Sequence, residues 1–367
     1  MSEEKPTLVR AGALLQFCED VFVRLGVQRA DAHITADVLV AADLRGVDSH
    51  GVARLKRYVD GLKDGVMKVH PQVRTVVETP ATITMDADGG LGQPVSYQAM
   101  RTALDKAANV GAGFATVRNS NHYGIAGYYA MMALERDMIG VCTTNSDVLV
   151  VPTFGRKALL GTNPIAVAVP CGRETAFVLD MATSTVPRGK IEVYDRLGKA
   201  MPEGWATDET GRNVTDATRV LKNLNTRAGG GLLPLGGEGE LLSGYKGYGL
   251  AMLVDILSAV LSGAAYSDLV YPRSAEGKPL PANLGHFFGA FRIDAFRPVD
   301  EFKRDMDDLV SRLKGADKAE GATRIYVAGE KEHEKTLERQ AKGIPLHPKV
   351  VAALTQIGSD QQVPLPF

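Results

Sequence analysis

Short stretches rich in β-branched and aromatic residues alternate with longer stretches of helical periodicity through the middle of the chain. The β-rich stretches lie at 73–77, 83–86, 114–118, 139–144, 165–169, 177–180 and 286–293. Apolar side chains recur at helical spacing between some of them, at 95–110 and 125–136, and again in a strong pattern at 248–263. Such alternation is typical of a sheet covered by helices, and it predicts an α/β body.

Helical spacing predominates at both ends of the chain. The predicted helices of the first part are 14–25, 30–44, and a third that starts near Asp48 or Ser49, either of which can cap its first turn. After residue 299 the pattern predicts a helix, a short strand at 325–327 and two more helices. These ends are therefore expected to contribute helices rather than strands to the fold.

The change of pattern suggests a division into domains. We expect a mainly helical domain made of 1–72 with 299–367, and an α/β domain at 73–298. The polar, glycine-rich stretch 195–244 has no clear periodicity apart from a possible short helix at 214–224. It is therefore expected to form excursion loops over the α/β domain.

Composition and charge exclude several classes of protein. The 367 residues are 45% hydrophobic and 23% charged, which is ordinary for a soluble globular protein. Lys and Arg number 42 and Asp and Glu 43, so the net charge is −1, and no long run of like charges occurs. We therefore expect no nucleic-acid partner. The most apolar stretch, 250–261, contains Asp255 and is too short to cross a membrane.

The cysteines and the first ten residues indicate the compartment. Cys18, Cys142 and Cys171 are odd in number, far apart in sequence, and form no Cys-x-x-Cys pair. This usage fits a reducing compartment and argues against a disulfide framework or a zinc site. Residues 1–10 contain Glu3 and Glu4 and no apolar core, so we expect neither a signal peptide nor a transit peptide. The expectation is a cytoplasmic protein without a metal site.

Glycine is in surplus, at 39 of 367 residues, yet the standard phosphate-binding loops are absent from the sequence. The segments 111–113 and 247–249 each read Gly-x-Gly but lack the third glycine of the dinucleotide fingerprint. Neither Gly-x4-Gly-Lys-Ser/Thr nor His-Glu-x-x-His occurs. An ordinary Rossmann or P-loop site is therefore disfavoured. The informative residues lie instead in polar clusters at predicted element ends, where ligand-facing residues gather.

The first cluster, 45–54, contains Ser49, His50 and Arg54 near a predicted helix start. His50, Arg54 and Arg57 share one helical face, and an arginine fork suits a carboxylate. A helix start also offers free N–H groups to an anion. The cluster is therefore either a carboxylate-binding corner or an ordinary capped helix with an exposed basic face.

Two further clusters follow predicted strands. His122, in Asn-Ser-Asn-His-Tyr-Gly at 119–124, can exchange a proton near neutral pH, although a lone histidine is more often structural. Asp147 ends the cluster 143–147; if the two strands are neighbours, it can accept a hydrogen bond from His122 and fix its tautomer. The alternative for Asp147 is an Asx turn that closes a strand.

The remaining clusters are candidates for phosphate or cofactor contacts. Segments 161–164 and 180–184 flank two strands that are expected to pair antiparallel. Lys246 lies between two glycines at 244–249, at the start of the strong helix, where backbone and a cation can approach a phosphate. The alternative for this last cluster is a flexible helix entry.

Taken in order, the clusters resemble the type 2 malate/L-lactate dehydrogenase family over residues 8–350. The motifs are Arg-Gly-x-x-Ser-His-Gly-x-x-Arg-Leu at 45–55, Asn-Ser-Asn-His-Tyr-Gly at 119–124, Gly-Thr-Asn-Pro at 161–164, Asp-Met-Ala-Thr-Ser at 180–184 and Tyr-Lys-Gly-Tyr-Gly-Leu at 245–250. Any one of these motifs is weak evidence, but five in register are jointly specific. The stretch 225–244 is longer and richer in glycine than the corresponding stretch expected in the shortest family members.

The resemblance implies a non-Rossmann NAD(P)-binding fold with a mixed sheet, and a homodimer with its active site in a cleft. It assigns roles to residues that match the motifs. His122 with Asp147 is the implied catalytic pair, and Ser49, His50 and Arg54 the implied substrate-binding residues. The implied cofactor-binding residues are Ser146, Asp180, Met181, Ala182, Lys246 and His286. NAD is the expected cofactor, and NADP stays open because Arg188 or Lys190 can meet a 2′-phosphate.

The implied activity is the interconversion of a 2-hydroxy acid and a 2-oxo acid. Malate and oxaloacetate are the leading pair, because the cations Arg54, Arg57 and His50 suit a second carboxylate. Lactate, sulfolactate or another 2-hydroxy acid is an alternative, as is reduction of a cyclic imine. A catalytically silent protein that senses a dinucleotide is the alternative from another class.

Overall fold

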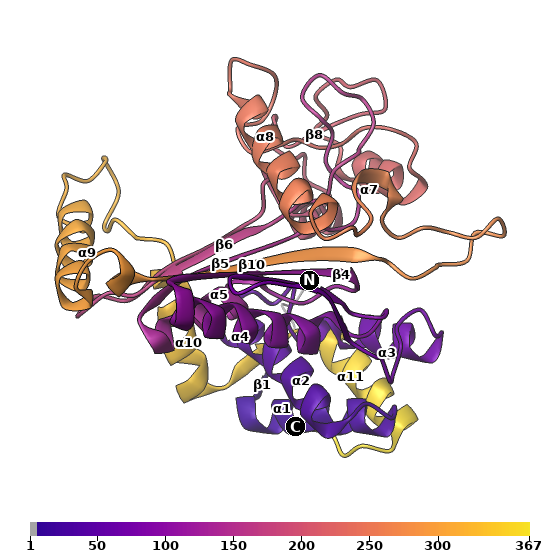
Figure 1. Ribbon diagram of the computed structural model, residues 1–367. Coiled ribbons are helices and arrows are strands. Elements are labelled where there is room, and N and C mark those ends of the chain that lie inside the picture. The colour runs from indigo at the N-terminus through magenta and orange to yellow at the C-terminus, as the bar shows by residue number, and fades with distance from the viewer. Residues whose placement is uncertain (1–5) are drawn as a thin grey trace.

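The computed structural model describes residues 6–367, and its centre is a mixed seven-stranded sheet (Figure 1). The strands in order across the sheet are β2 (Arg74–Glu78), β3 (Thr82–Asp86), β4 (Ala112–Ser120), β10 (Leu284–Arg292), β5 (Met138–Thr144), β6 (Ile165–Val169) and β7 (Phe177–Met181). Each strand predicted in this region is confirmed, with ends within two residues. The expected antiparallel pairing of β6 with β7 is also confirmed.

The position of β10 determines which segments meet at the sheet edge. Strands β4 and β5 each pair antiparallel with β10, so they run in the same direction with β10 between them. Among the described strands of this sheet, only β3 and β4 pair in parallel. The clusters that follow β4 and β5 therefore emerge at the same end of the strands, but with β10 between them.

Helices cover both faces of the sheet (Figure 1). Helices α4 (Gly92–Val110) and α5 (Ala126–Met131) pack on one face, where Met100 and Leu104 of α4 are buried against Val117 and Phe288. Helix α8 (Gly244–Asp255), continued by a π-helical segment at Ile256–Val260, covers the other face. The body is therefore a three-layer α/β structure, as the alternating pattern predicts.

A second hydrophobic core lies below α4 and brings the two ends of the chain together. Its helices are α1 (Ala11–Arg24), α2 (Arg29–Leu44), α3 (Leu55–Lys63) and α11 (Pro348–Gln361). The short strands β1 (Thr7–Val9) and β11 (Ile344–Leu346), which the sequence pattern does not predict, pair antiparallel beside it. Sequence periodicity identifies the helices because each has one apolar face, but three-residue strands leave no pattern.

The start of α3 differs from the prediction. A 3₁₀ turn at Val52–Arg54 precedes the helix, and the backbone N–H of Val52 donates to the carboxylate of Asp43 at 2.8 Å. Asp48 pairs instead with Arg339, and the hydroxyl of Ser49 with Nδ1 of His50. Neither predicted residue therefore caps the helix, because a carboxylate from α2 satisfies this turn.

The expected excursion loops contain more structure than the sequence pattern indicates. Helix α6 (Arg188–Leu197), the strand pair β8 (Ala206–Thr207) and β9 (Gly231–Leu232), and α7 (Ala217–Thr226) share a small core. Helix α7 confirms the predicted short helix, whereas α6 was not predicted because only Ile191 of its residues is buried. This small core forms the upper part of the molecule in Figure 1 together with α8.

The segment after β10 differs from the prediction in one element. Helices α9 (Val299–Lys314) and α10 (Glu330–Lys342) form, but the predicted strand at 325–327 does not. One backbone hydrogen bond joins β7 to the adjoining Ala328, from Val178 N–H to the Ala328 carbonyl at 3.0 Å, whereas the Val327 carbonyl accepts from Glu330 N–H at 3.1 Å. A single bond does not make a ladder, so the stretch stays irregular although its residues favour a strand.

Two absences concern the described residues. Across residues 6–367 no helix is both long enough and apolar enough to cross a membrane. Within the same range no group of three or more His, Cys, Asp or Glu side chains is arranged to hold a metal ion. The first five residues of the predicted N-terminal segment lie outside the described residues.

Candidate active site

Two adjoining cavities lie where the predicted clusters meet. The first, of about 360 Å³, is lined by Ser49, His50, Arg54, Arg57, His122, Ser146, Asp147, Leu149, Thr162, Pro187, Arg188, Gly189, Glu192 and Tyr271. The second, of about 480 Å³, shares four of these residues with it: Ser49, His50, Thr162 and Pro187. The structure therefore joins residues from the clusters at 45–54, 119–124, 143–147, 161–164 and 180–184 in one continuous site.

His122 stands at the end of β4 and is oriented by a tyrosine. The hydroxyl of Tyr58, on α3, is hydrogen-bonded to His122 Nδ1 at 2.6 Å, and the His50 ring stacks on His122 at 5.6 Å between centroids. Glycine at position 92 permits the close packing of α4 on this turn, because a Cβ there would lie 2.7 Å from the His122 carbonyl oxygen. The turn and the imidazole ring are thus both fixed.

The surroundings of His122 favour the neutral imidazole. Burial lowers its pKa well below the ordinary value, and the positive charges of Arg57 and Arg54 lower it further. Nε2 has no hydrogen-bond partner within residues 6–367, so it is free to meet a ligand. Because a hydroxyl both donates and accepts, Tyr58 can support His122 with its proton on either nitrogen.

The expected hydrogen bond between His122 and Asp147 does not form. Strand β10 separates β4 from β5, and neighbouring strands lie about 4.8 Å apart, which puts the two clusters out of direct reach. The Asp147 carboxylate accepts from Val148 N–H at 2.9 Å and lies 3.9 Å from Arg227. Asp147 still lines the first cavity, but Tyr58 takes the place at Nδ1 that was expected for it.

The predicted cationic face of α3 does line the cavity. Arg54 Nε donates to the carbonyl of Ser49 at 2.7 Å, and none of the described carboxylates forms an ion pair with Arg54. Arg57 donates to the hydroxyl of Tyr271 at 2.6 Å. Burial, together with the charges of Arg54 and Arg57, lowers the pKa of His50 to about 4. Arg54 is exposed and Arg57 half-buried, and both line the first cavity, so the cluster presents its cations to that cavity; its role as a carboxylate-binding corner stays a prediction.

Helix α6 supplies the opposite wall of the first cavity. Its Arg188 donates to Glu192 at 3.0 Å and to the Asn225 side chain at 2.9 Å. Lys190, on the same helix, lies 5.8 Å from the centre of the Trp205 ring. Both cations that were considered for a 2′-phosphate therefore already have partners in the protein.

The predicted cofactor residues fall into two groups. Asp180 and Ala182 line the second cavity, and the Asp180 carboxylate accepts from Gly127 N–H at 2.7 Å. Met181 lies between them at the end of β7. Ser146 lines the first cavity, and its hydroxyl accepts from Thr162 N–H at 3.0 Å. These four residues are therefore in or beside the joined cavities.

Lys246 and His286 line neither cavity. Lys246 is exposed in the first turn of α8, with its ammonium 5.9 Å from the Tyr245 ring. His286 is fully buried within the sheet, where Thr144 and Ser120 hydrogen-bond its two ring nitrogens at 2.7 and 2.8 Å. With both nitrogens occupied, the His286 ring has no hydrogen bond left to offer a cofactor.

Several residues of the site were not predicted. Tyr58 and Tyr271 carry hydrogen bonds to His122 and Arg57, and the segment 326–329 with Lys331 and Glu332 forms one side of the second cavity. Tyr58 follows Arg54 by four residues, so helical spacing gives a signal for it. Tyr271 and the 326–332 segment meet the site only through the tertiary fold.

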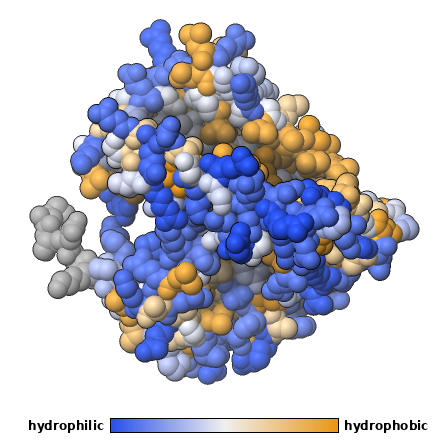
Figure 2. All heavy atoms as spheres, turned by 90° about the vertical axis from the view of Figure 1, so that its left-hand side faces the viewer, coloured by the Kyte–Doolittle hydropathy of each residue, from blue (hydrophilic) through white to orange (hydrophobic). Residues whose placement is uncertain are grey.

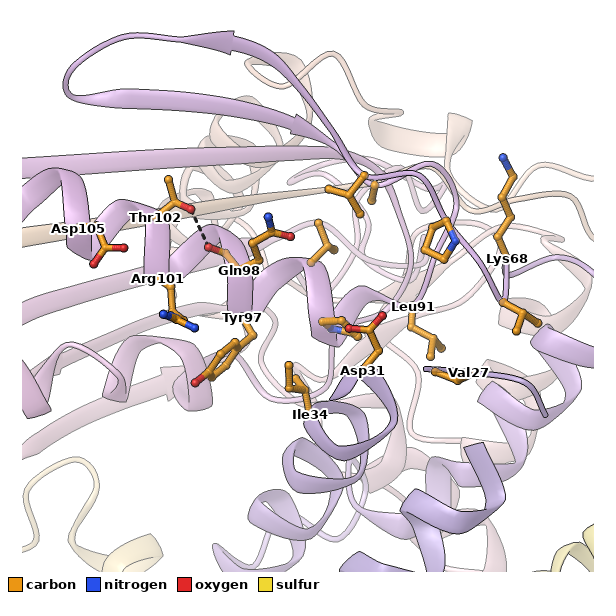
Figure 3. A pocket seen from close by; sticks show the side chains of 16 residues that line it. Val27, Asp31, Ile34, Lys68, Leu91, Tyr97, Gln98, Arg101, Thr102 and Asp105 are labelled. Atoms are coloured by element: carbon orange, nitrogen blue, oxygen red, sulfur yellow. Dashed lines mark hydrogen bonds between the residues drawn. The ribbon is translucent and has the colours of Figure 1, made fainter. Parts of the chain in front are cut away.

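A third groove, between α2 and α4, lies away from these residues (Figure 3). It has a volume of about 400 Å³, and Figure 3 shows Asp31 of α2 and Tyr97 and Arg101 of α4 along it. None of the predicted site residues lines this groove. It is therefore not part of the candidate active site.

Comparisons with known proteins give a family and several relatives to which the chain is similar over most of its length. A family model described as malate/L-lactate dehydrogenase matches residues 9–355. The chain is 50% identical to the malate dehydrogenase of Pyrococcus horikoshii, covering 94% of this chain and 92% of that protein. It is 40% identical to the L-sulfolactate dehydrogenase of Methanocaldococcus jannaschii, covering 88% of each. The crystal structure of malate dehydrogenase from Entamoeba histolytica, 36% identical, superposes with a TM-score of 0.94 over 99% of this chain and 100% of that one.

Proposed function

The chain belongs to the malate/L-lactate dehydrogenase family, and we propose that it interconverts malate and oxaloacetate with NAD as the hydride carrier. The observation that carries this proposal is the first cavity, where a neutral histidine and an unpaired arginine fork face one space. A 2-hydroxy acid needs both groups: a cation for its carboxylate and a base for its hydroxyl proton. The identity to malate dehydrogenases supports the same substrate pair.

The second cavity fits a nicotinamide dinucleotide. Its lining combines apolar side chains with the carboxylate of Asp180 and the cations Arg45 and Lys331. Apolar walls suit flat rings, an acid suits ribose hydroxyls, and cations suit phosphates. We propose that Asp180, Met181, Ala182 and Ser146 hold the cofactor, which when bound accepts or returns the hydride at the hydroxyl-bearing carbon.

The residues of the first cavity then have separate tasks. Arg54, with Ser49 and His50 beside it, binds the carboxylate next to the reacting carbon. In oxidation, Nε2 of His122 takes the hydroxyl proton while Tyr58 accepts from Nδ1; in reduction the same proton returns to the substrate oxygen. Asp147 contributes negative charge at the cavity wall rather than a hydrogen bond to His122.

Asp180 supports NAD rather than NADP as the preferred cofactor. A carboxylate in the second cavity binds ribose hydroxyls but repels a 2′-phosphate. Arg188 and Lys190, the cations considered for that phosphate, are engaged by Glu192 and Trp205. Equal catalytic efficiency with NADH and NADPH would contradict this preference.

A homodimer is proposed from the outer face of α8. Apolar side chains are exposed along this helix and its π-helical continuation, namely Leu250, Met252, Leu253, Ile256, Val260 and Leu261. Figure 2 shows a hydrophobic area at its upper right, on the side that carries α8. Exposed apolar patches of this kind commonly mark protein interfaces.

The three cysteines, none of them in a disulfide, support the proposed cytoplasmic location.

Sulfolactate is the second candidate substrate, because the cavity's cations suit a sulfonate as well as a carboxylate and one relative is an L-sulfolactate dehydrogenase. A panel of oxaloacetate, sulfopyruvate, pyruvate and a cyclic imine, each with NADH and NADPH, separates the candidates by the loss of reduced-cofactor absorbance. Oxaloacetate with NADH is expected to give the highest kcat/KM. No turnover of oxaloacetate would refute the malate proposal.

The variant His122→Ala separates an enzyme from a silent dinucleotide-binding protein. We expect NADH binding to quench the protein fluorescence of the variant as it does that of the parent protein. The kcat of the variant is expected to fall about 10²- to 10⁴-fold through loss of the acid–base group. Unchanged turnover would remove His122 from the reaction. NADH binding by the parent protein without turnover of any acid in the panel would favour the silent protein.

A further inference from the structure

Three arginines line the first cavity, and their protein partners differ. Arg188 is held by Glu192 and Asn225, so its guanidinium is largely occupied. Arg54 uses only Nε, on a backbone carbonyl, and keeps its fork free. Arg57 uses one terminal nitrogen, on the hydroxyl of Tyr271, and keeps its remaining N–H groups. Two guanidinium groups therefore remain available to oxyanions.

Tyr271 reaches Arg57 from a distant part of the chain. It belongs to the loop between the π-helical segment and β10, 214 residues from Arg57 in sequence. The Arg57 guanidinium lies 5.5 Å from the centre of its ring, so the tyrosine contacts the cation with both its ring and its hydroxyl. These contacts fix the Arg57 fork on the cavity wall.

The backbone of Tyr271 has an uncommon conformation. Its φ is +50°, in the left-handed region that bulky side chains rarely adopt. Backbone hydrogen bonds on both sides hold it there, from Tyr271 N–H to Ala282 and from Leu280 N–H to Pro272. Such conformations persist where the surrounding structure imposes them, and they are concentrated at ligand sites. Here the conformation directs an aromatic side chain at the one arginine it stabilises.

We propose that Arg57 and Tyr271 bind the second acidic group of the substrate and thereby determine the preference for dicarboxylic over monocarboxylic acids. This inference rests on the proposed function, in which Arg54 binds the carboxylate beside the reacting carbon. Arg54 and Arg57 are three residues apart on one helical face, so they present two forks to one cavity. A monoacid leaves the Arg57 fork desolvated and unpaired, which weakens its binding.

The test compares kcat/KM for oxaloacetate and pyruvate in the whole protein with NADH. We expect Arg57→Gln to lower the value for oxaloacetate about 100-fold, mainly through KM, and to change that for pyruvate about 3-fold or less. Tyr271→Phe removes one hydroxyl and is expected to lower the oxaloacetate preference about 5-fold with kcat unchanged. Arg57→Lys keeps the charge and is expected to restore part of the preference.

Lys56→Gln is the matched control, because Lys56 neighbours Arg57 but is exposed and pairs with Asp60. It is expected to leave both acids unaffected. An equal loss for oxaloacetate and pyruvate in Arg57→Gln would overturn the proposal, since Arg57 would then bind the carboxylate common to both. If Arg57→Gln does not fold, an unchanged preference in Tyr271→Phe overturns it.

A binding measurement separates this inference from the proposed reaction. Malonate, a dicarboxylate that cannot be oxidised at a hydroxyl, is expected to raise the Tm of the parent protein more than acetate does, and to lose that advantage in Arg57→Gln. A malonate effect without any turnover would refute the proposed reaction and retain the dicarboxylate site. Turnover of oxaloacetate with no difference between malonate and acetate would refute the site alone.

Discussion

At the scale of single residues, the site uses a tyrosine where a carboxylate is the familiar partner of a catalytic histidine. A buried carboxylate would stabilise the imidazolium strongly, whereas the neutral hydroxyl of Tyr58 does not. The arginines Arg54 and Arg57 also disfavour a positive charge on His122. These surroundings therefore favour the neutral form of His122, which is the form that the proposed base requires.

Replacement of Tyr58 by phenylalanine tests its role in positioning His122. We expect kcat to fall about 10- to 100-fold with KM little changed, because the ring keeps its place in the core but Nδ1 loses its partner. The pH profile of kcat is expected to shift as well, which a purely structural loss would not produce. Asp147→Asn is the comparison, and a larger loss there than in Tyr58→Phe would restore Asp147 as the orienting residue.

The kcat/KM values of the two directions should depend differently on pH below pH 6.5. Because burial and Arg57 lower the pKa of His122, the neutral base persists below pH 6.5, and kcat/KM for malate oxidation should stay level well into the acid range. The value for oxaloacetate reduction should rise as pH falls, since it needs the imidazolium. Initial rates between pH 5 and 9 check this, and a fall of malate oxidation centred near pH 6.5 would contradict it.

His286 links stability to pH. Burial lowers its pKa to about 3 in the folded state, against about 6.5 when unfolded, so its contribution is complete above pH 6.5 and is lost as pH falls toward 3. Urea unfolding at pH 7, 6 and 5 should therefore show decreasing stability. In His286→Gln, which cannot be protonated, stability is expected to be lower at pH 7 but to fall less between pH 7 and 5. Parallel pH curves would count against this assignment.

At the scale of elements, the sheet strands and most helices could be predicted because each carries a complete local pattern. The strands at 165–169 and 177–180 are continuous β-rich runs, and α1 and α2 have one apolar face each. Elements that depend on distant partners were missed or misplaced. Helix α6 buries little, the 3₁₀ turn before α3 depends on a carboxylate from α2, and 325–327 lacks a full hydrogen-bonded partner.

The first turn of α4 is expected to be sensitive to one methyl group. A Cβ at position 92 would lie 2.7 Å from the His122 carbonyl oxygen, so Gly92→Ala must displace either α4 or the catalytic turn. We expect a loss of about 1–3 kcal/mol in the free energy of unfolding and a lower kcat. Gly12→Ala in α1, where the Cβ meets nothing within 4 Å, is the control and is expected to stabilise by up to about 1 kcal/mol. Equal effects of the two substitutions would disprove this packing argument.

At the scale of the whole molecule, one core accounts for the α/β layers and a second for α1, α2, α3 and α11, whereas α9 and α10 contribute to neither. We propose the domain division 1–72 with 299–367 and 73–298, in which the segment 45–58 brings the substrate-binding arginines from the helical core to the end of β4. Helix α9 packs against the turn at 172–174, where three N–H groups donate to Asp307. The site therefore lies between the two proposed domains.

The assembly can be tested at the outer face of α8. Leu253→Glu places a charge on the exposed apolar side of the helix without removing a buried contact, since Leu253 is 45% exposed. If this face joins two copies, analytical ultracentrifugation should give a dimer for the parent protein and mostly monomer for the variant. A monomeric parent protein, or a variant that remains dimeric, would exclude this face as the dimer interface.

The sequence by itself determined the α/β class, the sheet strands and most of the clusters that line the two cavities, because periodicity, β-branched runs and short motifs are local properties. It also placed His122, Ser49, His50 and Arg54 among the site residues. The tertiary structure alone decided that β10 separates β4 from β5, which gives His122 a tyrosine partner and buries His286. It likewise brought Tyr271 to Arg57, since contacts across 214 residues depend on how elements pack and leave no trace in local spacing.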